Sequence, residues 1–234
     1  WNLMRDKNIK TLPVADENDH LLGVLAVSNL TSCYMDIWDN RILAKSNTTL
    51  DNIIDTLSAK ACYINENTNY FPGKIAVTAM QADTMTEHIE EGDIAIVGDR
   101  EEAQEALINI NVSLMIVTGG YAPCNRIVEL AKEHGVTLIV TQHDSFTASR
   151  LIVQSIPVGY VMVKDNIVSF TTDDLVDDIK GIMTETRFRS YPVLDQNAKV
   201  VGTVSRYHLI SNHKKKVIQV DHNERGQSVD GLED

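Results

Sequence analysis

Thr11-Leu12-Pro13-Val14-Ala15-Asp16-Glu17-Asn18 has a second copy 179 residues later in the chain, Ser190-Tyr191-Pro192-Val193-Leu194-Asp195-Gln196-Asn197. The match continues without a gap into Leu21-Leu22-Gly23-Val24 and Val200-Val201-Gly202-Thr203. Seven positions are identical between residues 1–30 and 180–209, namely Met4, Pro13, Val14, Asp16, Asn18, Gly23 and Leu30 with their partners. Self-similarity at a fixed spacing indicates two copies of one structural unit.

Both copies predict the same order of elements. A helix ends near Lys7 or Thr186, and a short strand follows at residues 12–15 or 191–194. Asp and Asn, which tolerate turn conformations, then reverse the chain. A second, mostly apolar strand at 21–27 or 200–205 leads into a short helix from about Ser28 or Arg206. One such unit leaves an apolar face uncovered, so we expect the two copies to pack against each other.

The second copy has further elements upstream. Residues 158–163 and 167–170 predict strands, and a helix is expected from Asp173 to Met183, after the cap signals of Thr171 and Thr172. The first copy has no counterpart to residues 158–179, and the chain begins at Trp1 rather than at Met. Both observations indicate a fragment.

The region between the copies, about residues 48–153, alternates apolar strands with helical periodicity. Strands are expected at 75–79, 94–97, 114–117 and 138–140, and helices at 101–110, 125–134 and 145–154. Gly135 stands where a helix would end, and Ser145 where the last helix would be capped. This order is typical of a wound, mostly parallel sheet. The predicted fold class is therefore α/β (mixed α+β), with an α/β domain inserted into a repeated pair.

Composition excludes several classes of protein. The 234 residues include 33 Asp and Glu against 21 Lys and Arg, a formal net charge of -12. This charge argues against sequence-blind nucleic-acid binding, and no apolar run is long enough for a membrane helix. We interpret Lys214-Lys215-Lys216, a single basic run, as a solvated strip. The odd, widely spaced cysteines Cys33, Cys62 and Cys124 favour reduced thiols in a cytoplasmic protein.

The repeat resembles the CBS domain, a paired module that binds adenosine nucleotides between its copies. The family has an apolar strand ending Gly-h-h-Ser/Thr-x-x-Asp, where h is apolar. The second copy has Gly202-Thr203-Val204-Ser205-Arg206-Tyr207-His208, which keeps the hydroxyl at Ser205 but has His208 in place of the acid. In the first copy, Gly23-Val24-Leu25-Ala26-Val27-Ser28-Asn29, Ala26 replaces the hydroxyl and Asn29 the acid. We therefore expect the better nucleotide site in the second copy.

The insert resembles the DRTGG domain. Asp99-Arg100 and Thr118-Gly119-Gly120, separated pieces of that motif, each follow an expected strand. Near the end of the chain, Asp221-His222-Asn223-Glu224 resembles a motif of the DHH-type, family II inorganic pyrophosphatases, in which the Asp is a manganese or cobalt ligand. The combination is similar to the regulatory region of the clostridial-type, CBS-containing members of that family. The resemblance implies a first CBS domain at 1–47, a DRTGG domain at 48–153, a second CBS domain at 154–213, and a linker with the start of the catalytic-domain motif at 214–234.

The resemblance also implies a set of site residues. Pro192, Val193 and the segment 158–163, with Val163, would form walls for adenine, and Tyr207 or Tyr191 would stack on it. Ser205, the following helix N-terminus and Arg206 would hold phosphate. His208 and, in the first copy, Ser28 and Asn29 complete the candidates. Each has a structural alternative: Ser205, Ser28 and Asn29 as helix caps, Arg206 in a surface ion pair, and Tyr207 and His208 as surface or packing residues. Asp221 would bind metal only in the intact parent enzyme.

Two functions of different classes remain open at this point. In the first, the chain is a regulatory module of an enzyme that hydrolyses diphosphate. The resemblance implies that AMP and ADP inhibit, that diadenosine polyphosphates activate some members, and that the module is a homodimer formed through its CBS domains. If two second-copy sites face each other across the dimer axis, one diadenosine ligand would bridge them past Arg206 of both subunits. In the second, the chain is an enzyme with a small phosphate-handling site near Gly119 and Asp99. No nucleophile–base pair or metal cluster is evident in the insert, which favours the first.

Overall fold

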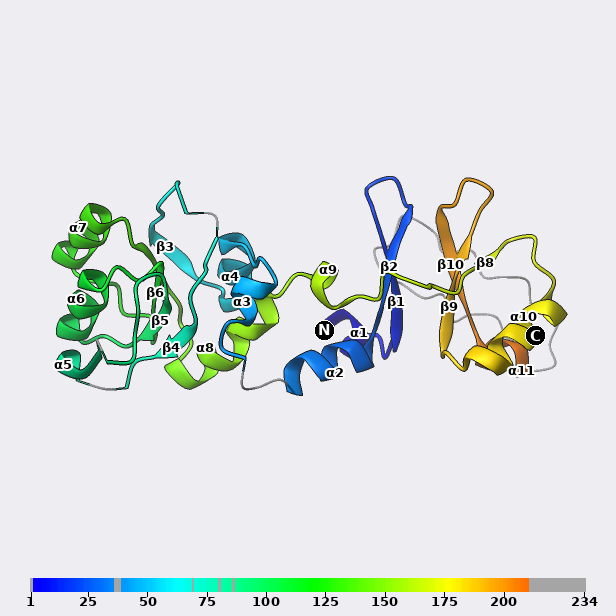
Figure 1. The fold of residues 1–234 in the computed structure, drawn as a ribbon, viewed down its shortest axis with the longest axis horizontal. Coiled ribbons are helices and arrows are strands. Elements are labelled where there is room, and N and C mark those ends of the chain that lie inside the picture. Colours follow the sequence, from blue (N-terminus) through cyan, green and yellow to red (C-terminus); the bar gives the residue numbers. More distant parts are fainter. Residues whose placement is uncertain (1, 36–38, 69, 80, 86, 211–234) are drawn as a thin grey trace. The chain divides into compact units, whose positions relative to one another are not determined.

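The computed structural model describes residues 2–35, 39–68, 70–79, 81–85 and 87–210 (Figure 1). The chain divides into two compact units, one made of Trp1–Met35 with Val161–Asp234 and the other of Asp36–Tyr160. The first unit contains both repeat copies, and the second contains the insert. Ile42 and Leu43 lie in the core of the second unit, which is why it begins before the expected boundary at residue 48.

The first compact unit, called the repeat unit below, contains the predicted elements in both copies. Each copy has a helix, an antiparallel pair of strands and a closing helix. The first copy comprises α1 (Asn2–Asp6), β1 (Thr11–Ala15), β2 (Leu21–Ala26) and α2 (Val27–Met35). The second comprises β8 (Phe170–Thr171), α10 (Val176–Thr186), β9 (Ser190–Leu194), β10 (Val200–Ser205) and α11 (Arg206–Ile210). β8 pairs with β9 in parallel, which adds a third strand to the second copy.

The hairpin turns of the two copies are matched in their hydrogen bonds. Asp16 Oδ1 accepts the N–H groups of Asn18 and His20 at 2.8 and 2.9 Å, and Asp195 Oδ1 accepts those of Asn197 and Lys199, both at 2.8 Å. These backbone donors, that of His20 or Lys199 above all, lower the pKa of each carboxyl. The shared Asp of the repeat therefore fixes the turn.

Two further backbone positions are shared although their residues differ. Asn8 and Arg187 follow the first helix of each copy with φ of 52° and 59°, and Asp19 and Ala198 lie in the turns with φ of 68° and 61°. A left-handed conformation suits Asn and Asp better than Arg or Ala. The second copy therefore keeps a backbone shape that its own residues do not favour.

The two copies pack on each other as expected. Strand β1 contacts both β9 and β10. At the tips of the hairpins, the Val200 N–H donates to the Asp19 carbonyl oxygen at 2.9 Å, and His20 and Lys199 form a short antiparallel bridge. Each hairpin thus covers part of the other.

The segment before the second copy differs from its prediction. Residues 158–161 form a helical turn, α9 (Val158–Val161), because Pro157 has a backbone angle suited to the start of a helix and its carbonyl oxygen accepts the Tyr160 N–H at 3.0 Å. Only Val163 is paired like a strand, with Val24. Helix α10 begins at Val176 rather than Asp173, because Asp174 Oδ2 accepts the Thr171 N–H at 2.7 Å and holds the preceding residues in a turn.

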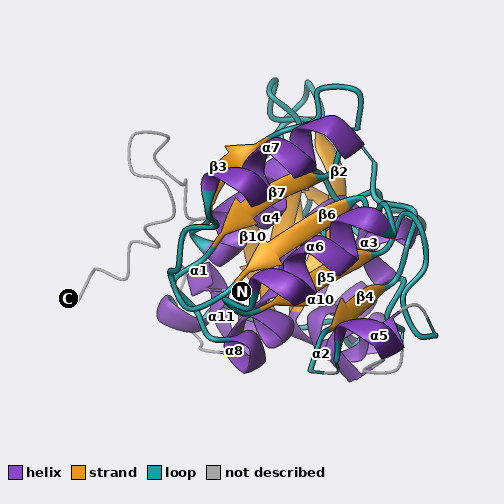
Figure 2. Ribbon diagram, turned by 90° about the vertical axis from the view of Figure 1, so that its left-hand side faces the viewer, coloured by secondary structure: helices purple, strands orange, loops and turns teal. Residues whose placement is uncertain are grey.

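The insert is a five-stranded sheet with helices on both faces (Figure 2). Its strand order is β3-β7-β6-β5-β4. The parallel strands are β4 (Ile75–Val77), β5 (Ile94–Val97), β6 (Leu114–Val117) and β7 (Thr137–Val140), and the edge strand β3 (Lys60–Tyr63) is antiparallel to β7. One face carries α5 (Ala82–Met85), α6 (Glu101–Asn109) and α7 (Asn125–His134). The other carries α3 (Ile42–Lys45), α4 (Leu50–Leu57) and α8 (Ser145–Leu151), which continues as the 3₁₀ helix η1 (Ile152–Ser155).

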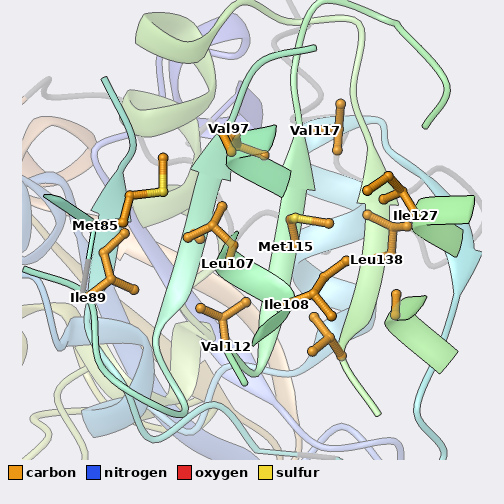
Figure 3. Close-up of a cluster of buried hydrophobic side chains, with 14 of the residues drawn as sticks. Met85, Ile89, Val97, Leu107, Ile108, Val112, Met115, Val117, Ile127 and Leu138 are labelled. Atoms are coloured by element: carbon orange, nitrogen blue, oxygen red, sulfur yellow. The ribbon is translucent and has the colours of Figure 1, made fainter. Parts of the chain in front are cut away.

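Alternate residues of the central strands enter two separate cores. Val97, Met115 and Leu138 point to the face of α6 and α7, where Leu107 and Ile127 meet them (Figure 3). The neighbouring residues of the same strands point to the opposite core. Gly135 ends α7 in the left-handed conformation, as predicted. Helix α8 is capped by Asp144, whose Oδ1 accepts the Thr147 N–H at 2.9 Å, and not by Ser145.

Candidate functional site

The repeat unit contains a cavity of about 810 Å³ lined by both copies. The first copy contributes the start of β1 and the junction of β2 with α2: Lys10, Thr11, Val24, Ala26, Val27, Ser28, Asn29, Thr31 and Ser32. The second contributes the loop before β9 and part of that strand: Arg187, Phe188, Arg189, Ser190 and Pro192. Val163, Asn166, Ile167 and Val168, from the segment before β8, complete the lining.

Local contacts fix this lining. The Val27 N–H donates to the Lys10 carbonyl oxygen at 3.0 Å, which holds the start of β1 beside the first turn of α2. Asn29 Oδ1 accepts the Ala26 N–H at 2.8 Å, half of a capping box. A Cβ atom at Gly23 would lie 2.6 Å from Met162 Sδ and 2.9 Å from the Val163 carbonyl oxygen. The glycine therefore lets the segment with Val163 pair with β2 and enter the cavity wall.

The cavity is positively charged in an acidic protein. Its lining includes Lys10, Arg187 and Arg189 but no Asp or Glu. In the part of the chain that the structure describes, none of these three cations forms an ion pair. With a net charge of -12 over the chain, such a gathering of cations is suited to an anion.

An apolar surface lies beside these charges. Val24, Val27, Val163, Ile167, Val168, Phe188 and Pro192 line the same cavity. The Phe188 ring is 52% exposed and meets the Tyr191 ring edge-on, with centroids 5.9 Å apart. Because Tyr191 packs against the Phe188 ring and part of the ring stays exposed, the ring offers a surface on which a flat base can stack. The cavity thus combines an apolar slot with an anion site, which is the chemistry of a nucleotide pocket.

The predicted site residues fall into two groups. Ser28, Asn29, Val163 and Pro192 line the cavity. Ser205, Arg206 and Tyr207 lie at the junction of β10 with α11, outside the cavity lining, and Tyr207 is 80% exposed. The backbone of His208 lies in α11, but its side chain, like all of Asp221, falls outside what the structure describes.

Tyr191 has a packing role rather than the predicted stacking role. Its side chain is 1% exposed, its ring centroid lies 5.1 Å from that of Phe170, and its hydroxyl hydrogen-bonds Thr186 Oγ1 at 2.7 Å. Phe188, three residues earlier, is the aromatic residue that reaches the cavity. Tyr191 and Val193, alternate residues of β9, face the core, whereas Phe188 lies in the loop before the strand.

Lys10, Arg187, Phe188 and Arg189 were not among the predicted site residues. The predicted site was centred on the strand and closing helix of the second copy, whereas the cavity joins the strand start and closing segment of the first copy to the strand start of the second. The available signal was Arg187-Phe188-Arg189 itself, an aromatic residue between two cations directly before a strand.

The glycine pair of the insert forms a turn. Gly119 and Gly120 have φ of 83° and 77°, and their N–H groups donate to the carbonyl oxygens of His143 and Thr141 at 2.8 and 2.9 Å. Thr118 Oγ1 also has partners: it donates to the Val97 carbonyl oxygen and forms a hydrogen bond with Ser145 Oγ. These donors are therefore occupied, so the pair does not form the phosphate cradle of the enzyme hypothesis.

The described residues contain neither a candidate metal site nor a candidate membrane span. No three His, Cys, Asp or Glu side chains among them gather at a distance suited to a metal ion. None of the helices in the described ranges is long and apolar enough to cross a bilayer.

Comparison with known proteins gives matches to both units. The family model of the DRTGG domain matches residues 52–155, and that of the CBS domain matches residues 1–36 and 158–214. A solved structure of the CBS and DRTGG domains of the regulatory region of Clostridium perfringens pyrophosphatase, complexed with the activator diadenosine tetraphosphate, is 63% identical. It covers 88% of this chain and 90% of that one, with a TM-score of 0.83.

Curated relatives match over nearly the whole chain. The cobalt-dependent inorganic pyrophosphatase of Clostridium perfringens is 66% identical over 234 residues, 100% of this chain and 43% of that protein. The probable manganese-dependent inorganic pyrophosphatase of Thermotoga maritima is 33% identical over 99% of this chain and 42% of that protein. The chain thus spans a little over two fifths of the length of these relatives.

Proposed function

The chain belongs to the family of CBS–DRTGG regulatory regions, and from that premise we propose that it senses adenine nucleotides for an inorganic pyrophosphatase. The proposed parent enzyme hydrolyses diphosphate to two phosphates in a catalytic part with manganese or cobalt. AMP and ADP would inhibit it, and diadenosine polyphosphates would activate it. Asp221 remains a proposed metal ligand of the parent enzyme, and no catalytic step is assigned to the described residues.

One observation supports this proposal most strongly. The cavity between the two CBS copies combines three cations with an apolar wall, and no carboxylate lies in its lining. In this cavity Phe188 stacks on adenine, Arg187 and Arg189 bind phosphate, and Ser28 and Asn29 offer polar groups to the ribose. Ser205, Arg206, Tyr207 and His208 remain proposed contacts for a second nucleoside, at the junction of the second copy that corresponds by the repeat to residues 26–29.

Calorimetric titration of the purified chain with AMP tests this function. Binding without release of phosphate from diphosphate in the presence of manganese is the expected result. Phe188→Ala should weaken AMP binding about 5- to 150-fold, because stacking of a base on an aromatic ring contributes roughly 1–3 kcal/mol. Phe146→Ala, which removes an exposed ring of the insert, is the matched control and should leave AMP affinity unchanged. Equal losses in both variants, or turnover of diphosphate, would reject the proposal.

We also propose a homodimer assembled through the CBS domains. Leu3 and Ile182 occupy equivalent helix positions in the two copies and are both exposed, and Leu175 and Val176 extend the apolar surface at the start of α10. The repeat leaves this helix position exposed in both copies. The same surface of a second chain would cover it, as in a two-fold dimer. One diadenosine polyphosphate, or two AMP, would then bind per dimer.

Light scattering at micromolar concentration checks the assembly. The chain should have the mass of a dimer, and Ile182→Glu should shift it toward the monomer, because a buried unpaired carboxylate is costly. Leu22→Glu changes an equally exposed residue on β2, away from α10, and should not. A wild-type monomer with and without nucleotide would contradict the dimer.

The free thiols Cys62 and Cys124 support the cytoplasm as the compartment of the protein.

A further inference from the structure

Both connections between the two compact units begin in the wall of the cavity. The insert starts at Asp36, directly after α2, and the chain re-enters the repeat unit at Val161. Half of the residues that line the cavity belong to α2 or to residues 161–168, which we call the return segment. The insert is therefore attached to the repeat unit through two walls of the proposed nucleotide site, although the lining residues all belong to the repeat unit.

The first CBS copy holds these two attachments together. Val161 packs against a small core that also contains Leu30 of α2. Val163 and Val24 of β2 exchange two backbone hydrogen bonds, both of 2.9 Å, which form an isolated bridge and not a longer ladder. The return segment enters the cavity wall at this pair, because Val24 and Val163 both line the cavity.

Gly23 allows this close pairing. A Cβ atom at Gly23 would lie 2.6 Å from Met162 Sδ and 2.9 Å from the Val163 carbonyl oxygen, so a larger residue would push the return segment away from β2. Gly23 and Val24, together with Met162 and Val163, thus form a small joint between the chain that leaves the insert and the wall of the cavity.

We propose that a nucleotide in the cavity fixes both attachments of the insert and so couples the insert to ligand binding. This inference rests on the proposed nucleotide site and adds the route by which its occupancy reaches the second unit. The Val163 side chain is 45% exposed, so a ligand in the cavity can bury it together with Ile167 of the return segment and Val27 of α2. Those contacts are lost whenever an attachment opens, so opening and binding exclude each other.

The size of the effect follows from mass action. A ligand that binds only the closed form slows an opening that destroys its site about 100-fold when its concentration is 100 times its dissociation constant. Suitable reporters are amides on the insert side of each attachment. The Arg41 and Ile42 N–H groups donate to Asp39, and the Tyr160 N–H donates to the Pro157 carbonyl oxygen. These residues lie outside the cavity lining, so a ligand would affect their amides through the attachments.

Hydrogen exchange of the whole chain, with and without AMP at 100 times its dissociation constant, tests this inference. Peptides that contain residues 39–42 and 157–161 should exchange about 10-fold more slowly, or slower still, with AMP. In Gly23→Ala the slowing at 157–161 should fall below about 3-fold, while AMP at 100 times its own dissociation constant for the variant still slows residues 187–192. Gly159→Ala is the matched control. It makes the same replacement in α9, where a Cβ atom meets nothing within 4 Å, and should keep the wild-type ratio of exchange rates.

The outcomes separate this inference from the function on which it rests. If AMP slows residues 187–192 of the wild type but leaves 39–42 and 157–161 unchanged, the coupling is wrong and the nucleotide site stands. Full slowing at 157–161 in Gly23→Ala would likewise show that the joint is not the route. If AMP does not bind to the wild-type chain, both proposals are wrong. The wild-type comparison needs no variant, so the test holds even where Gly23→Ala does not fold.

Discussion

Arg187→Asn should weaken AMP binding about 10- to 150-fold and at the same time stabilise the protein. The loss of affinity follows from removing one of the cations that flank Phe188, because a charged hydrogen bond contributes about 1.5–3 kcal/mol. The gain in stability follows from the backbone. Arg187 ends α10 with φ of 59°, where its N–H donates to the Met183 carbonyl oxygen. A residue other than Gly, Asn or Asp is destabilised by roughly 1 kcal/mol in that conformation. Asn8 occupies the same position in the first copy.

Ala198→Asn is the matched control. Ala198 has φ of 61° in the hairpin turn of the second copy, and it does not line the cavity. The same replacement should therefore raise the melting temperature without changing AMP affinity. Melting curves and calorimetry on both variants give the comparison. A stabilised Arg187→Asn that binds AMP like the wild type would remove Arg187 from the site. A destabilised variant would show that the arginine side chain, and not its backbone, supports the end of α10.

The second large effect is expected at Asp93 in the insert. Its side chain is 1% exposed, and its two oxygens accept the N–H groups of Lys74 and Glu90, both at 2.9 Å. The Lys74 ammonium lies 3.5 Å from Oδ2. Asp93→Ala leaves two backbone donors without an acceptor and takes the buried carboxylate away from the Lys74 ammonium, so it should lower the free energy of unfolding of this unit by about 3–5 kcal/mol. The loop before β4 would lose its side-chain hydrogen bond to Asp93, while the Lys74 carbonyl oxygen would still accept the Ile94 N–H.

Hydrogen exchange of the β5 and β6 amides is the suitable measurement, because it reports the opening of the insert separately from that of the CBS pair. Glu90→Ala is the control. Its carboxylate also approaches the Lys74 ammonium, at 3.7 Å, but is 70% exposed, so its removal should cost less than about 1 kcal/mol. If the two variants change exchange equally, the burial of Asp93 is not what stabilises this loop.

Sequence patterns predicted the insert best where strands are buried on both faces. Residues 94–97 and 114–117 are continuous apolar runs, and the observed strands have the same bounds. Strand β3 was missed because it is an edge strand with three exposed residues of four, so it has no apolar alternation. Helix α4 was missed although Thr49 Oγ1 accepts the Asn52 N–H, a cap that the sequence contains.

The candidate site was only partly predictable, for a topological reason. The repeat located the strand starts and the closing helices, and four of the predicted residues do line the cavity. Which copy supplies which wall depends on how the copies face each other, and periodicity along one copy does not contain that information. Arg187 and Phe188 were overlooked because they lie in a loop, where no apolar period marks them.

The insertion of a complete α/β domain between the two CBS copies affects the order in which the parts of the protein fold during synthesis. All five strands of the insert precede residue 141, whereas β9 begins at Ser190, 50 residues after the end of β7. At ordinary rates of synthesis this interval lasts roughly 3–10 s, long enough for the insert to fold on the ribosome while the first hairpin still lacks its partner. Closure of the pair then joins strands that are about 180 positions apart, a slow kind of contact. Changes in either hairpin should therefore affect the yield of folded protein in the cell more than its melting temperature.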